Sequence, residues 1–416
     1  METVTKMSSP KEERSFRNTF PDFTSDALPP LNKNKELEGD FQSKILSAIE
    51  KLLNTLDEKA EDDGKDYSIY TGSSGHALLH LHLYMNFPGV QDQADLYKAL
   101  NWLKPILGRL KGSKPSMLCG ISGPLAIAAV VYDKLGEKKI SGEYVAKVLA
   151  LCEEVCNDFS IPDELLFGRA GYLSALLFLQ QHLGPQVINN NMVVKVVDAI
   201  LVSGQDLAKR KHYKHPLMYE WHDKAYLGAA HGLAGIFFIL LQVSDPSVQK
   251  QIREFVKPCV DYMLTLRFAS GNCPSSLEST SGDKLVHWCH GAPGWMYMLV
   301  LAFKIFKDMR YLEAAKDCAK VTWERGILYK GYGLCHGTAG NAYSFLFLYK
   351  ATQDPRYLYY ACKFAEWCCD YGKHGCHKPD RPYSLFEGMA GTVYFLVDLL
   401  HPQNAAFPTF EFNINI

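Results

Sequence analysis

The sequence predicts an all-α protein, a double α/α barrel in which seven inner and seven outer helices close into a toroid. A Gly-x-x-Gly motif recurs seven times, at intervals of 46 to 64 residues, and a fixed motif at such a period indicates a repeat architecture. An apolar stretch and then an amphipathic stretch follow each copy, and strand signals are few. Two helices in each of seven units give about fourteen helices.

The first helix of each unit is expected to begin at its two glycines. These pairs are Gly72 and Gly75, Gly120 and Gly123, Gly168 and Gly171, Gly232 and Gly235, Gly291 and Gly294, Gly337 and Gly340, and Gly388 and Gly391. The residues after each pair are apolar for about three turns, which is typical of a helix buried on all sides. Because glycine lets crowded backbones approach closely, we expect the starts of the inner helices to meet at one rim.

The second helix of each unit is amphipathic. In residues 251–268 and 355–372 apolar side chains recur three and four positions apart, as expected of a helix with one buried face. An open solenoid is the alternative to a closed ring, but solenoids usually end in polar capping repeats. The last motif, from Gly388, is followed by a stretch as apolar as those in the middle of the chain, which favours closure.

Length and composition limit the domain organisation and the partners. The 416 residues exceed the usual size of one core, but a closed ring accommodates them, so we expect a mobile segment at 1–40 and a single barrel domain at 41–416. A net charge of −1 argues against nucleic acid as a partner. No apolar run approaches the roughly 20 residues of a membrane span. Twelve cysteines without a secretion signal indicate a reducing compartment. We therefore expect a cytoplasmic monomer without a transmembrane segment; a nuclear location or peripheral association with the plasma membrane is also compatible with the sequence.

The residues directly before the first glycines should lie at the rim of the barrel. They are Thr71, Cys119, Phe167, His231, His290, His336 and Glu387, and Cys289 and Cys335 stand one place earlier in their copies. Two thiolates and one imidazole form a mixed sulfur and nitrogen set that suits Zn²⁺ and leaves a fourth position open. On this reasoning alone the nitrogen ligand is either His336 or His290.

Several longer motifs make the chain recognisable. They include PDELLFGRAGYL, PLMYEW, GAAHGLAGI, LVHWCHGAPG, KGYGLCHGTAGNAY and SLFEGMAGT. With these motifs the chain resembles the lanthionine synthetase C-like (LanC-like) family, the eukaryotic relatives of bacterial cyclases that close thioether rings, from about Arg14 to the C-terminus. The resemblance implies a double α/α barrel and one zinc ion held by Cys289, Cys335 and His336.

The same resemblance implies that glutathione binds beside the zinc as a co-substrate. The positions that match its contacts are Arg14, Lys330, His377, Lys378, Pro379 and Asp380. Many relatives carry Arg at the position of His377, and an acid and a small residue at the positions of Ile121 and Ser122. Lys378 or Arg381 is the alternative source of the cation that His377 does not supply, and the change at Ile121 and Ser122 removes one polar group from the rim.

The activity that the resemblance implies is a zinc-dependent glutathione S-transferase reaction, which adds the glutathione thiol to dehydroalanine or dehydrobutyrine residues in proteins or peptides. His231 matches the catalytic histidine of the family, and Glu164 matches an acidic position of the bacterial enzymes. One alternative is a non-catalytic signalling or adaptor protein that binds glutathione or another small ligand. Another is a hydrolase with paired carboxylates, for which Glu164 and Glu387 form no convincing pair.

Overall fold

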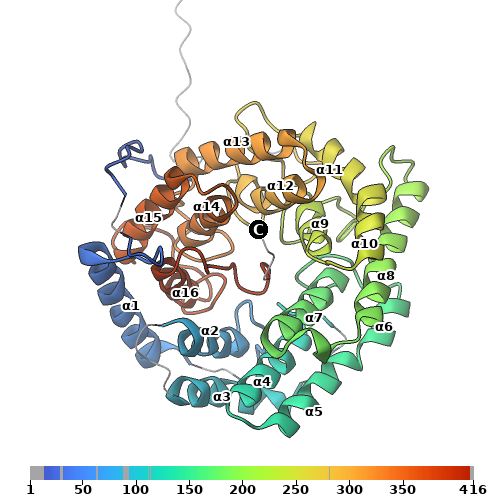
Figure 1. Ribbon diagram of the computed structural model, residues 1–416, viewed down its shortest axis with the longest axis horizontal. Coiled ribbons are helices and arrows are strands. Elements are labelled where there is room, and N and C mark those ends of the chain that lie inside the picture. Colours follow the sequence, from blue (N-terminus) through green and yellow to red (C-terminus); the bar gives the residue numbers. More distant parts are fainter. Residues whose placement is uncertain are drawn as a thin grey trace, which may run out of the picture.

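Two concentric rings of helices make up the described part of the chain (Figure 1). The computed structural model describes residues 14–28, 31–61, 64–87, 93–110, 112, 114–280 and 282–412. Within these ranges only isolated β-bridges occur and no sheet is formed. The all-α class that the repeat predicts is confirmed.

The inner ring consists of the seven helices that follow the Gly-x-x-Gly motifs. They are α2 (Ser73–Asn86), α4 (Ser122–Lys134), α7 (Arg169–Leu183), α9 (Leu233–Leu241), α12 (Ala292–Phe306), α14 (Thr338–Thr352) and α16 (Met389–Leu400). Each packs against the next, and α16 returns to pack against α2 (Figure 1). The structure is therefore a closed toroid and not an open solenoid.

The outer ring covers the inner one with seven segments. They are α1 (Gly39–Lys59), α3 (Gln93–Leu107), α5 (Lys138–Leu149) with the short α6 (Cys152–Asn157), α8 (Asn190–Arg210) after the single turn η1 (Pro185–Val187), α10 (Pro246–Gln251) with η2 (Ile252–Val256) and α11 (Lys257–Leu264), α13 (Met309–Arg325), and α15 (Pro355–Cys369). The helix expected over 251–268 is interrupted. Pro258 has no N–H to donate to the preceding turn, and the chain responds with a π-turn in which Lys257 N bonds the carbonyl of Ile252.

The glycine motifs have a steric cause that the structure makes explicit. A Cβ atom built on Gly340 would lie 1.7 Å from the carbonyl oxygen of Leu334. In all seven copies the second glycine faces the carbonyl oxygen six residues before it, at 1.7 to 2.5 Å from such a Cβ. The loop before each inner helix thus folds back onto the start of that helix. The close approach predicted from the glycines is present, and the partner is largely the preceding loop of the same unit.

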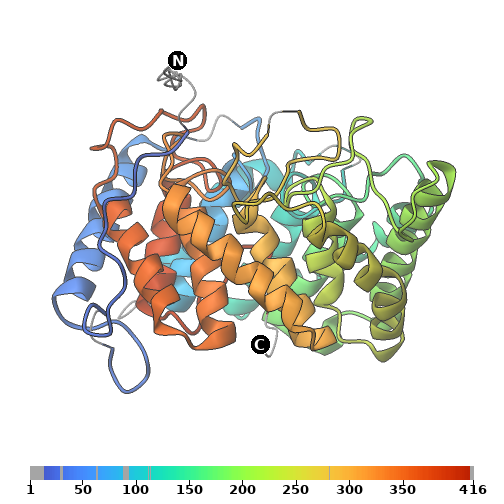
Figure 2. The same ribbon diagram turned by 90° about the horizontal axis from the view of Figure 1, so that it is seen from above.

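These loops gather on one side of the barrel, and the C-terminal segment enters from the other (Figure 2). Residues 401–412 run into the centre of the ring (Figure 1). There the Phe407 ring stacks on Trp288 at 4.8 Å, and the Phe410 ring lies 4.5 Å from Phe238. The barrel interior is therefore filled by the end of the chain, which the helical repeat does not predict.

Part of the segment expected to be mobile lies against the barrel. Phe16 N donates to the carbonyl of Ile327 at 2.8 Å, and Tyr329 N donates to the carbonyl of Arg14 at 3.1 Å. The Phe16 ring also lies 5.0 Å from Trp367. These contacts bring Arg14 to the loop side of the barrel, while residues 1–13 of the expected segment fall outside the described residues.

Candidate active site

A cavity of about 360 Å³ opens where the loops of several units meet on the loop side of the barrel. Its walls come from sequence positions far apart. The lining residues are Arg14, Tyr70, Leu166, Ala230, His231, Leu285, His287, Cys289, His290, Lys330, Cys335 and His336. The rim positions predicted to carry metal-binding side chains therefore share one cavity with two cations.

Cys289, Cys335 and His336 form a group able to hold a metal ion. The two sulfurs and one ring nitrogen all lie within 4.8 Å of one another, and no other such group of three is found in the described residues. The backbone fixes this arrangement, because Cys289 N donates to the carbonyl of Cys335 at 3.2 Å and Cys335 N donates to the carbonyl of Phe386 at 2.8 Å. Two thiols and one imidazole are a donor set that fits Zn²⁺.

His290 does not belong to this group. Its Nδ1 is buried and has no hydrogen-bond partner among the described residues, and its ring lies 6.4 Å from that of His231. Of the two histidines that the donor types left open, His336, the one that the family resemblance implies, lies beside the two sulfurs.

Burial controls the charge of this cavity. It raises the pKa of the Cys335 thiol well above its usual value, and the adjacent Cys289 adds to the effect. Burial also lowers the pKa of His290 to about 4, and it lowers that of His287 to about 3, with His336 adding to the shift of His287. Both imidazoles are uncharged at neutral pH, and thiolates at this depth require a cation beside them.

His231 is oriented by Glu164 from the next unit of the ring. Its Nδ1 lies 2.7 Å from Glu164 Oε2, and Glu164 is only 2% exposed. The same carboxylate accepts hydrogen bonds from Leu166 N at 2.9 Å and Phe167 N at 2.5 Å. Since Nδ1 faces Glu164, Nε2 is the nitrogen that His231 can offer to the cavity. The carboxylate of Glu164 is thus engaged by His231 and two backbone amides.

The residues matched to glutathione contacts divide into two sets. Arg14 and Lys330 line the cavity. The stretch from His377 to Asp380 lies in the loop between α15 and α16 and does not line it, although His377 N donates to the carbonyl of Tyr329 at 2.7 Å. Ser122, one of the three positions that depart from the family pattern, is fully buried at the start of α4.

Two further cavity residues were not singled out from the sequence. Tyr70 stacks on Phe386 at 5.0 Å, and burial raises the pKa of its hydroxyl well above the usual value, with Cys335 and Cys289 adding to the shift. His287 lies 4.0 Å from the sulfur of Cys289. Both precede the first glycine of their motif by two to four residues, so extending the comparison of units upstream would have found them.

Comparison with known proteins agrees with this fold and identifies the family. The family model described as lanthionine synthetase C-like protein matches residues 63–412, and the chain belongs to this family. A relative from Danio rerio, named Glutathione S-transferase LANCL1, is 47% identical over 406 residues, which cover 96% of this chain and 99% of the relative. The solved structure of nisin cyclase superposes with a TM-score of 0.66 at 15% identity, covering 86% of this chain and 94% of that chain, and shows the same fold. None of the described helices is long and apolar enough to span a membrane.

Proposed function

We propose that the protein is a zinc-dependent enzyme that adds the thiol of glutathione to dehydroalanine or dehydrobutyrine residues in proteins. One observation carries the proposal: the cavity that contains Cys289, Cys335 and His336 also contains a histidine held in place by a buried carboxylate. A metal site made for thiols and an oriented acid–base group are the two parts that a thiol addition needs. The name of the Danio rerio relative points to the same class of reaction.

Glutathione fits the charge of the cavity. Its two carboxylates are matched by Arg14 and Lys330. Arg14 also lines an adjacent cleft with Lys284, in which Arg325 is already paired with Asp283. Charge-assisted hydrogen bonds from these cations fix the tripeptide and direct its thiol toward the buried sulfurs. The exposed loop that contains His377 and Lys378 runs beside Tyr329, where it offers further polar contacts to the bound peptide.

The reaction is a conjugate addition across a carbon–carbon double bond. The sulfur forms a bond to the β-carbon, the electron pair of the double bond moves toward the α-carbon and its carbonyl oxygen, and a proton then reaches the α-carbon. A zinc ion held by the Cys289, Cys335 and His336 group supplies the Lewis acidity that favours the thiolate form of glutathione. His231 moves the proton through Nε2, while Glu164 holds its ring and stabilises the imidazolium that forms.

Metal analysis tests the first part of the proposal. The purified protein should contain about one zinc per chain, since three protein ligands form one site. Cys335→Ala should lose the zinc and melt at a lower temperature, because a bound metal stabilises the folded state. Cys362→Ala is the matched control, since Cys362 is an equally buried thiol on α15. Stoichiometric zinc in both Cys289→Ala and Cys335→Ala would disprove the site.

Turnover of a dehydroalanine peptide with glutathione tests the second part. His231→Asn should keep its zinc and its glutathione affinity but add the thiol about 10²–10⁴-fold more slowly, because the histidine acts in the transition state. If the folded, zinc-loaded variant reacts at the normal rate, His231 is a packing residue. A wild-type protein that binds glutathione without turnover would instead be a non-catalytic adaptor.

A further inference from the structure

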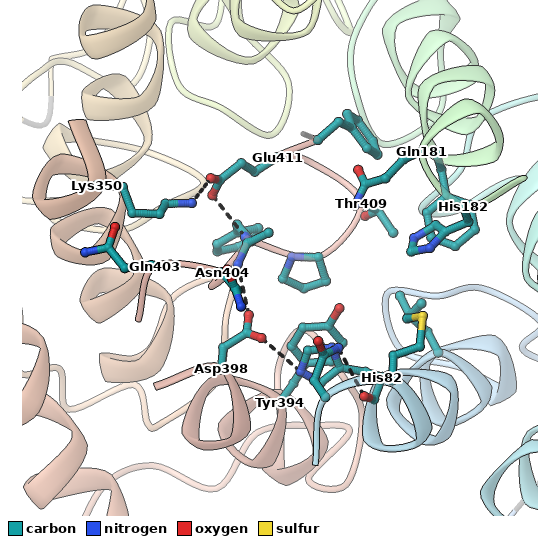
Figure 3. A pocket seen from close by; sticks show the side chains of 18 of the residues that line it. His82, Gln181, His182, Lys350, Tyr394, Asp398, Gln403, Asn404, Thr409 and Glu411 are labelled. Atoms are coloured by element: carbon teal, nitrogen blue, oxygen red, sulfur yellow. Dashed lines mark hydrogen bonds and ion pairs between the residues drawn. The ribbon is translucent and has the colours of Figure 1, made fainter. Parts of the chain in front are cut away.

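A second and larger cavity lies at the opposite end of the barrel from the candidate active site. Its volume is about 570 Å³, and none of its lining residues lines the cavity that contains the cysteines. It is enclosed by the last turns of α2, α7 and α14, by α16, and by the C-terminal segment 401–412 (Figure 3). Phe407 forms part of its wall and also stacks on Trp288 in the barrel interior.

The charged groups of this cavity are all engaged by other groups of the protein. Lys350 forms an ion pair with Glu411 and donates to the carbonyl of Ala405 at 2.5 Å. Asp398 accepts hydrogen bonds from the Tyr343 hydroxyl at 2.7 Å and from Ala406 N at 3.0 Å. Its other oxygen lies 3.0 Å from a ring nitrogen of His82 (Figure 3). A charged ligand would therefore have to displace partners that already hold Lys350, Glu411 and Asp398.

Several uncharged polar groups remain available. The Thr409 hydroxyl is buried, in a residue only 4% exposed, and has no hydrogen-bond partner among the described residues. The cavity is also lined by the ring of His182, the hydroxyl of Tyr394 and the side-chain amide of Asn404. None of these three groups forms a hydrogen bond with another described residue. Burial lowers the pKa of His182 to about 4, so its neutral ring offers one donor and one acceptor.

The walls also contain ring faces and a constrained backbone. The His82 ring stacks on Tyr394 at 3.6 Å and 13°, and Phe178 and Phe407 contribute further apolar surface. Thr409 has a φ of +59°, which is unfavourable for a β-branched residue. The Ser174 hydroxyl donates to the carbonyl oxygen of Thr409 at 2.5 Å. Such constrained residues persist where the surrounding structure imposes them, and they are frequent at ligand-binding sites.

We propose that this cavity is a second ligand site, built for an uncharged polyhydroxylated molecule of mono- or disaccharide size. Such a ligand satisfies the free hydroxyl, amide and imidazole groups, which an apolar ligand would leave unpaired at a cost. Its ring can lie against the aromatic walls, and the volume is within the usual range for small-molecule sites. The inference does not depend on the proposed transferase activity, because the two cavities share no lining residue.

The test titrates the full-length, zinc-loaded protein with neutral sugars, namely glucose, galactose, sucrose and trehalose. Saturation-transfer NMR detects binding and calorimetry measures the affinity. At least one neutral sugar should bind saturably. Glucuronate and glucosamine, which carry one charge each, should bind at least about tenfold more weakly than glucose, because a buried unpaired charge is costly. The absence of saturable binding by all four sugars, or equal affinity for the charged pair, overturns the proposal.

Two variants place the binding in this cavity. His182→Leu removes a donor and an acceptor, and Met85→Trp fills space from the α2 side of the wall. Each should weaken sugar binding by at least about tenfold. Gln186→Leu is the matched control, because Gln186 is exposed just after α7 and lies outside the cavity. Melting temperature establishes that each variant is folded. Wild-type affinity in both folded cavity variants would refute the assignment.

Discussion

The contact between Glu164 and His231 permits a sharp test, the substitution Glu164→Gln. The carboxylate accepts three contacts, from Leu166 N, Phe167 N and His231 Nδ1, and is almost completely buried. A glutamine has the same shape but only one oxygen. Whichever way its amide turns, its NH₂ group faces at least one N–H donor, so one buried donor is left unpaired. That costs about 1–3 kcal/mol of unfolding free energy.

The same substitution should affect the reaction more than the fold. In either orientation the amide is uncharged, so it cannot stabilise the imidazolium as a carboxylate does. We expect the rate of glutathione addition to a dehydroalanine peptide to fall about 10²–10³-fold, with zinc content and glutathione affinity unchanged. Urea denaturation and single-turnover kinetics on one preparation measure both effects. A normal rate per folded molecule would refute the orienting role of Glu164.

Three further predictions use other parts of the structure. Lys330→Ala should weaken glutathione binding roughly ten- to a hundredfold, which is the contribution of one charge-assisted hydrogen bond. Lys320→Ala, on the outer helix α13, is the control and should leave the affinity unchanged. Equal affinities of the two variants in calorimetry would show that Lys330 does not contact glutathione. Gly340→Ala should lower the unfolding free energy by more than about 3 kcal/mol, because the new Cβ meets a carbonyl oxygen. The control Gly142→Ala should raise it by about 0.5–1 kcal/mol, since Gly142 is exposed within α5 and has open space around it. Similar denaturation midpoints for the two variants would contradict the steric account. The pKa of His182 is lowered to about 4 from 6.5 in the folded state, so its stabilising contribution is complete above pH 6.5 and is lost as the pH falls toward 4. Over that range the wild type should lose up to about 3 kcal/mol more than His182→Leu, and parallel pH profiles in denaturation would show that the ring is not buried as a neutral group.

The sequence by itself determined the helical class, the seven units and the ring. These features follow from short-range constraints between residues of the same unit. The second glycine of a motif is required by a carbonyl only six residues earlier, and an apolar stretch of about three turns needs neighbours on all sides. The candidate metal residues were also visible, because Cys289 and Cys335 occupy the same position in two adjacent units.

Only the tertiary structure decided which groups meet. The donor types alone left His336 and His290 open, and only the family resemblance favoured His336. The structure shows that the His336 ring lies beside the two sulfurs, in a loop that is not yet helical and where no periodicity applies. The contact between His231 and Glu164 joins residues 67 positions apart, and their two motifs differ in sequence. The C-terminal segment fills the barrel and builds the second cavity because Phe407 and Phe410 find apolar rings in its interior. This packing depends on the closed ring, and no local pattern in the sequence of the segment predicts it.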